Sequence, residues 1–420
     1  MDGAVLRQWR RSRGWDVPEM ARRLRVAAGG SALPEPESLR RMVWRWEREG
    51  LRNERYELLY ARALRIAPDD LAGGAVGPPV SSLLPAGGGE DGDDPVKRRE
   101  FGMATLGALA GIAVPSGVDE GPVTIEHVGA LRRVVAELWS RDREVGGSAL
   151  LTEAKGYYST ARGWLDSGTY TTAVGADLVA VAAEIAACAG FIAFDASDQV
   201  KARSLLTESL ILSGSTPHLA AHACALLAMQ SSSLSSATGR IGLARESLRL
   251  LDQASQVARH EPSAKLHAVV AMRRSLAAAL LGDGQGARRH LDGARRELDR
   301  GEHPSDPAWF AFVTPTELTA HEATAAVHLG QAERAAGVYR DVLSAESMSA
   351  RNRVFYSARL ASALEAAGDH LEAIRTGLGV LGDLESAVRS GRALNLLKPV
   401  RALSTPGDEF AARYDALVTA

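Results

Sequence analysis

This chain of 420 residues contains few cysteines and few aromatic residues, and both facts limit the kind of fold it can adopt. Two cysteines, Cys188 and Cys224, are too few for a disulfide framework and fit a reducing cytoplasm. Aromatic residues make up 5% of the chain, and no stretch alternates apolar and polar residues as a half-buried strand does. Because alanine and leucine are abundant instead, we predict an all-α protein that resides in the cytoplasm.

The sequence also lacks the motifs of common enzymes and cofactor-binding proteins. It contains no phosphate-binding glycine loop, nucleophile elbow or paired-carboxylate constellation. His218 and His222 stand at i and i+4 with Cys224 nearby, a spacing that can hold zinc. No glutamate base adjoins them and no second cysteine pair is present, so we interpret all three as helix residues. We predict no enzymatic activity, no cofactor and no metal site.

The most informative segment is residues 37–50, ESLRRMVWRWEREG. On a helix that turns about 100° per residue, its apolar residues fall on one stripe, namely Leu39, Met42, Val43 and Trp46. The opposite arc carries Arg40, Arg41, Trp44, Arg45 and Arg48. Such a helix suits the major groove of DNA, because guanidinium groups match phosphates and the O6/N7 edge of guanine. The alternative is a solvated amphipathic helix, and the neighbouring segments favour the first interpretation.

Short helices are predicted on both sides of this segment. One ends near Gly14, another is capped by Asp16, a further one is capped by Asn53, and residues 69–71 resemble the start of a last turn. Residues 1–67 contain 15 arginines and no lysine against nine acidic residues, a surplus of six positive charges in a chain of net charge −2. This asymmetry is typical of a nucleic-acid-binding module in a longer protein.

These residues together resemble the lambda-repressor-like (Xre-type) helix-turn-helix domain. The resemblance rests on Leu6-x-x-Trp9, Gly14-Trp15, PEMARRL at 18–24, VWRWER at 43–48 and the closing Tyr56, Leu64 and Leu71. It implies a five-helix DNA-binding bundle over residues 1–71. It also implies roles in DNA contact, at base edges and phosphates for Arg40, Arg41, Trp44 and Arg45, and at phosphates for Arg48 and Arg52.

Two features depart from that family. Its second helix usually opens with Ser/Thr-Gln, whereas this chain has Asp16-Val17. Its turn between the second and third helices is roughly three or four residues long, whereas residues 27–37 form a longer insertion that contains Gly and Pro. A second interpretation therefore stays open, a protein-interaction scaffold whose helix-turn-helix domain has lost DNA binding and acts on a sigma factor or another regulator.

Residues 72–96 are rich in Gly, Pro and acidic residues and are predicted to form a flexible linker. The next segment, residues 97–122, begins KRREFGM and continues with an apolar run, which resembles a twin-arginine export signal. An export signal belongs at the N-terminus. The apolar run, residues 101–114, is 14 residues long and too short to span a bilayer. We therefore predict no membrane contact, and a helix over 97–122 that docks on the following domain or on a second subunit.

From about residue 123 the chain repeats a signature. Gly282, Gly330 and Gly368 are each followed five residues later by an alanine that opens a new helix. These helices carry triads at positions 0, 4 and 7, which are Ala287/Leu291/Ala294, Ala335/Tyr339/Val342 and Ala373/Gly377/Val380, with weaker examples at Ala202/Leu206/Ser209 and Ala244/Leu248/Leu251. The pattern resembles the tetratricopeptide repeat, whose unit is about 34 residues. It implies an α-solenoid of about five to six helix pairs over residues 123–420, with a concave groove.

The repeat register predicts which side chains line that groove. They are Met272, Leu276, Glu317, Thr324, His328, Phe355, Ser362 and Glu365, with Trp309 and Phe310 as a wall. Each of them could instead serve ordinary packing between repeats. Regulators that combine these two domains are often dimers that bind a signalling peptide, so the resemblance implies a homodimer with a peptide or protein ligand. Such grooves often hold peptide backbones through asparagine amides. The chain has only three asparagines, so a small-molecule ligand stays open as an alternative.

The sequence as a whole predicts a bacterial DNA-binding transcriptional regulator. Its expected partners are double-stranded DNA, a second copy of the chain and a ligand in the groove. Ligand binding is expected to change the curvature of the solenoid, and with it the separation of the two recognition helices in a dimer.

Overall fold

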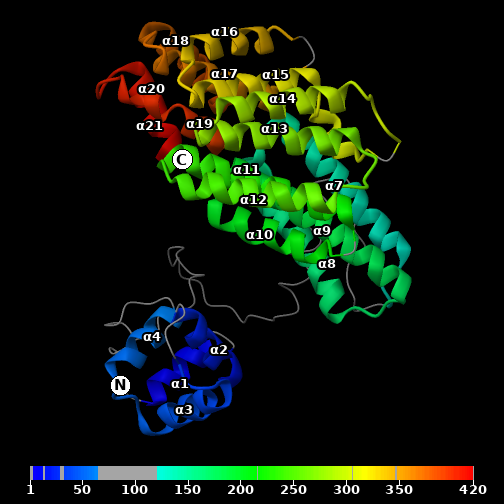
Figure 1. Cartoon of the computed structure of the whole chain (residues 1–420), viewed down its shortest axis with the longest axis vertical. Coiled ribbons are helices and arrows are strands. Elements are labelled where there is room, and N and C mark those ends of the chain that lie inside the picture. Colours follow the sequence, from blue (N-terminus) through cyan, green and yellow to red (C-terminus); the bar gives the residue numbers. More distant parts are fainter. Residues whose placement is uncertain are drawn as a thin grey trace, which may run out of the picture. The chain divides into compact units, whose positions relative to one another are not determined.

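The computed structural model describes residues 3–12, 15–28, 33–64, 121–214, 216–304, 306–345 and 348–419. These residues form 19 α-helices and one 3-10 helix and contain no strand, which confirms the all-α prediction (Figure 1). The chain divides into two compact units, Met1–Asp93 and Asp94–Ala420. The predicted fifth N-terminal helix, the linker over 72–96 and nearly all of the docking segment 97–122 lie outside the described residues.

The first unit contains four described helices, α1 (Gly3–Ser12), α2 (Val17–Ala27), α3 (Pro36–Glu49) and α4 (Glu54–Leu64). The predicted caps are present at both positions, because Asp16 Oδ1 accepts a hydrogen bond from the Glu19 amide at 2.7 Å and Asn53 Oδ1 accepts one from the Tyr56 amide at 3.4 Å. The apolar stripe of α3 is buried against the other three helices, with Leu39 and Val43 fully inaccessible.

A buried ion pair joins the first helix of this unit to the third. Arg10 in α1 donates from Nε and Nη2 to the two carboxylate oxygens of Glu47 in α3, at 2.6 and 2.8 Å. Its Nη1 donates to the carbonyl of Trp15 at 2.6 Å. The hydrogen bond to Glu47 raises the pKa of Arg10 against the opposing effect of burial. This bidentate pair fixes the roll of α3 about its axis, and therefore which face α3 turns outward.

The second unit is an array of packed helix pairs (Figure 1). In chain order the pairs are α7 (Ile125–Val145) with α8 (Gly147–Ser167), α9 (Thr172–Asp195) with α10 (Gln199–Leu212), α11 (Pro217–Thr238) with α12 (Ile241–Val257), α13 (Ala264–Leu280) with α14 (Gly284–Leu298), α15 (Pro315–His328) with α16 (Ala332–Leu343), and α17 (Ala350–Ala366) with α18 (His370–Ser386). The 3-10 helix η2 (Ala308–Phe312) precedes α15, and α19 (Gly391–Leu396), α20 (Lys398–Ala402) and α21 (Glu409–Thr419) end the array.

The repeated glycines end the first helices of three pairs, as the sequence signature predicts. Gly282, Gly330 and Gly368 have φ angles of +79°, +73° and +83°, in the left-handed region that favours glycine. The aspartate that follows two of them caps the next helix, since Asp283 Oδ1 accepts from the Gly286 amide at 2.7 Å and Asp369 Oδ1 accepts from the Glu372 amide at 3.3 Å. The local signature therefore encodes both the end of one helix and the start of the next.

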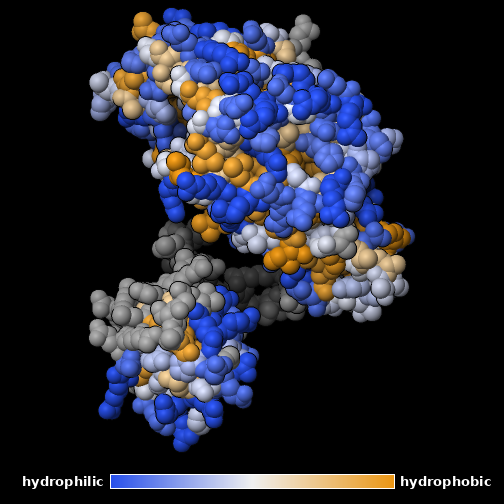
Figure 2. Space-filling view, in the orientation of Figure 1, coloured by the Kyte–Doolittle hydropathy of each residue, from blue (hydrophilic) through white to orange (hydrophobic). Residues whose placement is uncertain are grey.

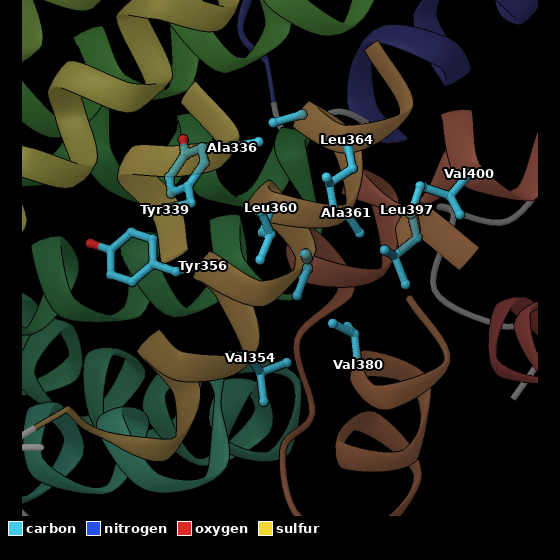
Figure 3. Close-up of a cluster of buried hydrophobic side chains, with 14 of the residues drawn as sticks. Ala336, Tyr339, Val354, Tyr356, Leu360, Ala361, Leu364, Val380, Leu397 and Val400 are labelled. Carbon is cyan, nitrogen blue, oxygen red and sulfur yellow. The ribbon is translucent and has the colours of Figure 1, made fainter. Parts of the chain in front are cut away.

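The predicted triads of the second helices form part of the core. Fourteen of the fifteen triad residues are buried, and the remaining one, Leu248, is partly buried. Figure 3 shows part of the largest apolar cluster, where Leu360, Ala361 and Leu364 of α17 lie among side chains of α16, α18 and α20. The hydroxyl of Tyr356 points away from this cluster (Figure 3). Helix α9 has the length and hydropathy of a membrane span, but 78% of its apolar window is buried inside the array.

The array returns on itself, so that its last helices contact its first ones. Helix α17 contacts α7, and α19 contacts α9. Buried Asp142 of α7 lies 2.6 Å from Nη2 of Arg351, and buried Asp195 of α9 accepts from Nε of Arg392 at 3.0 Å. The amide of Arg389 also donates to the carbonyl of Val145 at 2.7 Å. We call these contacts the closure; they enclose a cavity.

Candidate functional site

The outer face of α3 carries the residues that the helix-turn-helix resemblance implies for DNA contact. Arg40, Arg41, Trp44, Arg45 and Arg48 are exposed on this helix, and exposed Arg52 follows it. Trp44 is 56% exposed, and the guanidinium carbon of Arg48 lies 5.1 Å from the centre of its ring. Two shallow hollows follow the same surface. The structure thus brings all six predicted residues to one side of the first unit.

The guanidinium groups of this face are not neutralised by the carboxylates that the structure describes in this unit. Within the part of the chain that the structure describes, Arg40, Arg41, Arg45, Arg48 and Arg52 form no ion pair. By contrast, Arg22 and Arg23 of α2 both pair with Glu19. The four arginines of α3 and the adjoining Arg52, which we call the arginine face of α3, therefore present five cations that can accept an external anion without first breaking an ion pair.

The second candidate site is the cavity that the closed array surrounds, with a volume of about 140 Å³. Its walls come from one helix of each pair, α7, α9, α11, α13, α15 and α17, together with η2 and α19. Rings supply much of the surface, from Trp139, Phe191, His222, Trp309, Phe312, Phe355 and Tyr356. Figure 2 shows that hydrophilic side chains, interrupted by apolar patches, cover much of the visible outside of this unit, in contrast to this aromatic interior.

Five of the ten predicted groove residues line this cavity. They are Leu276, Trp309, Glu317, Thr324 and Phe355. Of the other five, Met272 and Phe310 are buried in the neighbouring apolar cluster, and His328 and Glu365 are partly buried further along their helices. Ser362, which the register also pointed inward, is partly buried outside the lining as well.

Of the two predicted residues of α13, Leu276 lines the cavity and Met272 does not. The wall of the cavity is built by Val269, Arg273 and Leu276, at spacing 0, 4 and 7, whereas Met272 belongs to the adjoining stripe that packs on the next helix. In α17 the lining extends toward the helix start, through Arg351 and Asn352, rather than toward its end. The closure holds the start of α17, at Arg351, against α7, and a local repeat register cannot predict this contact.

The cavity is rich in arginine, which sequence reasoning missed. Five arginines line it, Arg143, Arg273, Arg351, Arg359 and Arg392, against one carboxylate, Glu317. Glu317 accepts a hydrogen bond from the hydroxyl of Tyr356 and lies 3.6 Å from Nδ1 of His321. Burial lowers the pKa of His321, although Glu317 opposes that effect. Burial and the neighbouring Glu317 raise the pKa of Tyr356 well above its ordinary value, so this phenol stays protonated.

Aromatic rings hold two of these arginines in place. The guanidinium of Arg392 lies 4.0 Å from the ring centre of Phe355 and 5.6 Å from that of Phe191. The guanidinium of Arg351 approaches the same Phe191 ring at 5.2 Å. Burial disfavours the charge of Arg351, but Asp142 and Asp195 outweigh burial and raise its pKa. Arg351 and Arg392 thus belong both to the closure and to the cavity wall.

The metal-ligand spacing noted in the sequence does not gather its residues into one site. His222 lines the cavity, where its ring lies 5.2 Å from Phe310 and 6.1 Å from Trp309. His218 faces Glu261 at 4.0 Å, and Cys224 is buried in the apolar cluster between α11 and its neighbours. Among the described residues, no group of three potential ligands converges on a point.

No protein-family model matches this chain, and no curated protein resembles it significantly.

Proposed function

We propose that this protein is a DNA-binding transcriptional regulator whose helix array senses a ligand in its cavity. The observation that carries the proposal is the arginine face of α3, where five exposed guanidinium groups pair with no carboxylate of the described chain. The buried Arg10–Glu47 pair supports the same reading, because it holds the opposite side of α3 in the core of the unit. Arginine on a rigid helix is the common means of reading both phosphates and guanine edges.

The array supports the sensing part of the proposal. Its cavity lies where the first and last helix pairs meet, and Arg351 and Arg392 take part in both. A ligand that contacts either arginine therefore acts on the closure directly, and a ligand shifts a conformational equilibrium only through such differential contacts. We propose that a homodimer carries two α3 helices to two half-sites and that closure of the array sets their separation.

The test is the salt dependence of binding to duplex fragments from the promoter region of the protein's own gene, followed by fluorescence anisotropy. If all five arginines contact phosphates, the affinity of one copy should fall by roughly 10² to 10³ between 50 and 200 mM salt. The R41A/R45A variant should lose preference for a specific fragment, and its slope in log Kd against log salt should decrease by about 1.8.

The matched control is R22A/R23A, which removes the same charge from the same unit at arginines that already pair with Glu19. This variant should keep its preference among fragments and lose only a few-fold in affinity. Equal loss of preference in both variants, or a wild-type affinity that does not change with salt, would contradict DNA reading by α3.

One observation favours the scaffold alternative. Trp44 is the one large apolar side chain exposed on the described part of the first unit, and tryptophan is enriched at protein interfaces. A W44A variant separates the two functions through the salt dependence of DNA binding. A DNA reader that keeps all five arginines should keep its slope in log Kd against log salt, whereas a protein contact centred on Trp44 should be lost.

A further inference from the structure

One corner of the cavity contains polar groups that have no partner in the described protein. Arg273 is 6% exposed, and its Nη1 has no hydrogen-bond acceptor. His222 is 3% exposed, and neither of its ring nitrogens has a partner. The indole Nε1 of Trp309 is likewise unpartnered. Buried polar groups normally find partners, so three such groups around one cavity indicate that something else supplies their hydrogen bonds.

The sign of the charge at this corner is positive. Burial lowers the pKa of Arg273 to about 10, with Glu317 opposing the shift, so its guanidinium remains charged at neutral pH. Burial lowers the pKa of His222 to about 3, so the imidazole is neutral there and offers one donor. Arg143 and Arg359, which also line the cavity, form no ion pair among the described residues. Three guanidinium groups without a carboxylate partner therefore face one space whose single carboxylate, Glu317, is already bonded to Tyr356.

The rest of the wall suits a flat apolar body. Trp139, Phe191 and Trp309 approach the same space, with Trp139 and Phe191 rings 5.3 Å apart. The cavity of about 140 Å³ is close in size to an engineered apolar cavity of roughly 150 Å³ that binds benzene. A peptide needs many backbone donors and acceptors along its length, whereas Asn352 is the one asparagine in the lining and its Oδ1 already accepts from Arg351 at 2.8 Å.

We propose that the cavity binds a small aromatic carboxylate, with the carboxylate on Arg273, His222 and Trp309 and the ring against the wall that Trp139 and Phe191 form together. This inference names the ligand class for the sensing part of the proposed function, and it stands or falls independently of DNA binding.

The test uses three small probes on the full-length protein, observed by NMR. The probes are 4-fluorobenzoate, its neutral isostere 4-fluorobenzamide, and trifluoroacetate as an anion without a ring, each followed through the broadening of its ¹⁹F signal. We expect 4-fluorobenzoate to bind with a Kd on the order of 0.1 to 1 mM, as ten heavy atoms allow. The other two probes should bind at least tenfold more weakly.

The R273M variant should weaken 4-fluorobenzoate binding at least tenfold and leave 4-fluorobenzamide binding unchanged. The matched control is R274M, which removes the same charge from the adjacent residue, outside the cavity and paired with Asp252 at 2.5 Å. R274M should bind 4-fluorobenzoate as the wild type does. Because Arg273 is buried without an ion-pair partner, R273M should also melt at or above the temperature of the free wild type, whereas a merely structural arginine would give a lower melting temperature.

Several results would overturn the proposal. They are equal binding of the benzoate and the benzamide, equal binding of trifluoroacetate, absence of binding by 4-fluorobenzoate, or equal effects of R273M and R274M. A short peptide that binds tightly and does not respond to R273M would reassign the cavity to peptide recognition. If the protein bound 4-fluorobenzoate as expected but did not bind DNA as expected, the regulator proposal would fail and the ligand-site proposal would stand.

Discussion

The pair between Asp142 and Arg351 gives the sharpest test of the closure, because it joins α7 to α17 across 209 residues of sequence. Asp142 is fully inaccessible, the side chain of Arg351 is 11% exposed, and their nearest atoms are 2.6 Å apart. Removing one partner of such a pair leaves a buried charge uncompensated, at a cost of roughly 3–5 kcal/mol. The R351M variant should therefore destabilise the contact between α7 and α17 by that amount.

Hydrogen exchange followed by mass spectrometry measures this contact in the full-length protein, because peptides from α7 and α17 report their local opening. A loss of about 3–5 kcal/mol corresponds to exchange that is roughly 10² to 10³ times faster or more. D142N should give a similar acceleration. The double variant D142N/R351M leaves no isolated charge, so it should recover most of the loss, with a coupling energy of about 2 kcal/mol or more.

The control is R375M, which removes an arginine of α18 whose side chain is 77% exposed and paired with Glu372 on the surface. Its exchange should change twofold or less, because exposed pairs contribute little. If R351M accelerated exchange in α7 and α17 by less than fivefold, or if the double variant were as unstable as the two single ones combined, the closure would not depend on this pair.

Three further predictions concern stability. R10M should accelerate exchange in α1 and α3 by roughly a hundredfold or more, since it strands the 4% exposed Glu47 carboxylate, and equal exchange in variant and wild type would show that the pair does not hold α3. Burial lowers the pKa of His222 to about 3 in the fold, whereas the pKa is about 6.5 in the unfolded chain. Between these values only the unfolded chain gains the proton, so the stability falls as the pH falls below 6.5. Guanidinium denaturation at pH 7.5 and 5 should therefore show a loss of about 2 kcal/mol in the wild type relative to H222F, and a constant difference would refute the neutral buried imidazole. G330A should cost about 1–2 kcal/mol in thermal stability, because φ is +73° with open space around the new methyl. G146A should cost clearly more, because its Cβ would also lie 2.6 Å from the Arg389 carbonyl oxygen at the closure. Equal costs would argue against tight backbone contact at Gly146.

The local parts of this fold could be predicted because short stretches of sequence encode them. A glycine in the left-handed region followed by a capping aspartate marks the junction at Gly282 and at Gly368, and each junction needs only neighbouring residues. The apolar stripe of α3 is similarly local, and its helix begins and ends within one residue of the predicted segment. Periodicity therefore predicted both the exposed arginine face and the buried triads.

The closure and the cavity could not be predicted from those patterns, because they depend on contacts between distant segments. Nothing in the repeat register distinguishes Arg351 and Arg392 from exposed arginines, although both are drawn inward by aspartates about 200 residues earlier. The available signals were indirect. Arg273 interrupts a helix that is otherwise rich in alanine and valine, and Gly146 allows a backbone approach that a side chain would block.

The position of Arg351 and Arg392 decides how ligand and closure must influence each other. Arg273, His222 and Trp309, the proposed partners of the ligand carboxylate, line the same cavity as both closure arginines, and Nη2 of Arg351 keeps its bond to Asp142 when that ligand binds. A ligand bound in this way contacts the closed array more favourably than an opened one, and should stabilise it. A substitution that populates an opened array should therefore lower the apparent ligand affinity in proportion to the lost closed population, at most by the factor through which the ligand favours closure. The closure variants and the cavity probes therefore report on the same coupling free energy, the one between ligand binding and closure of the array.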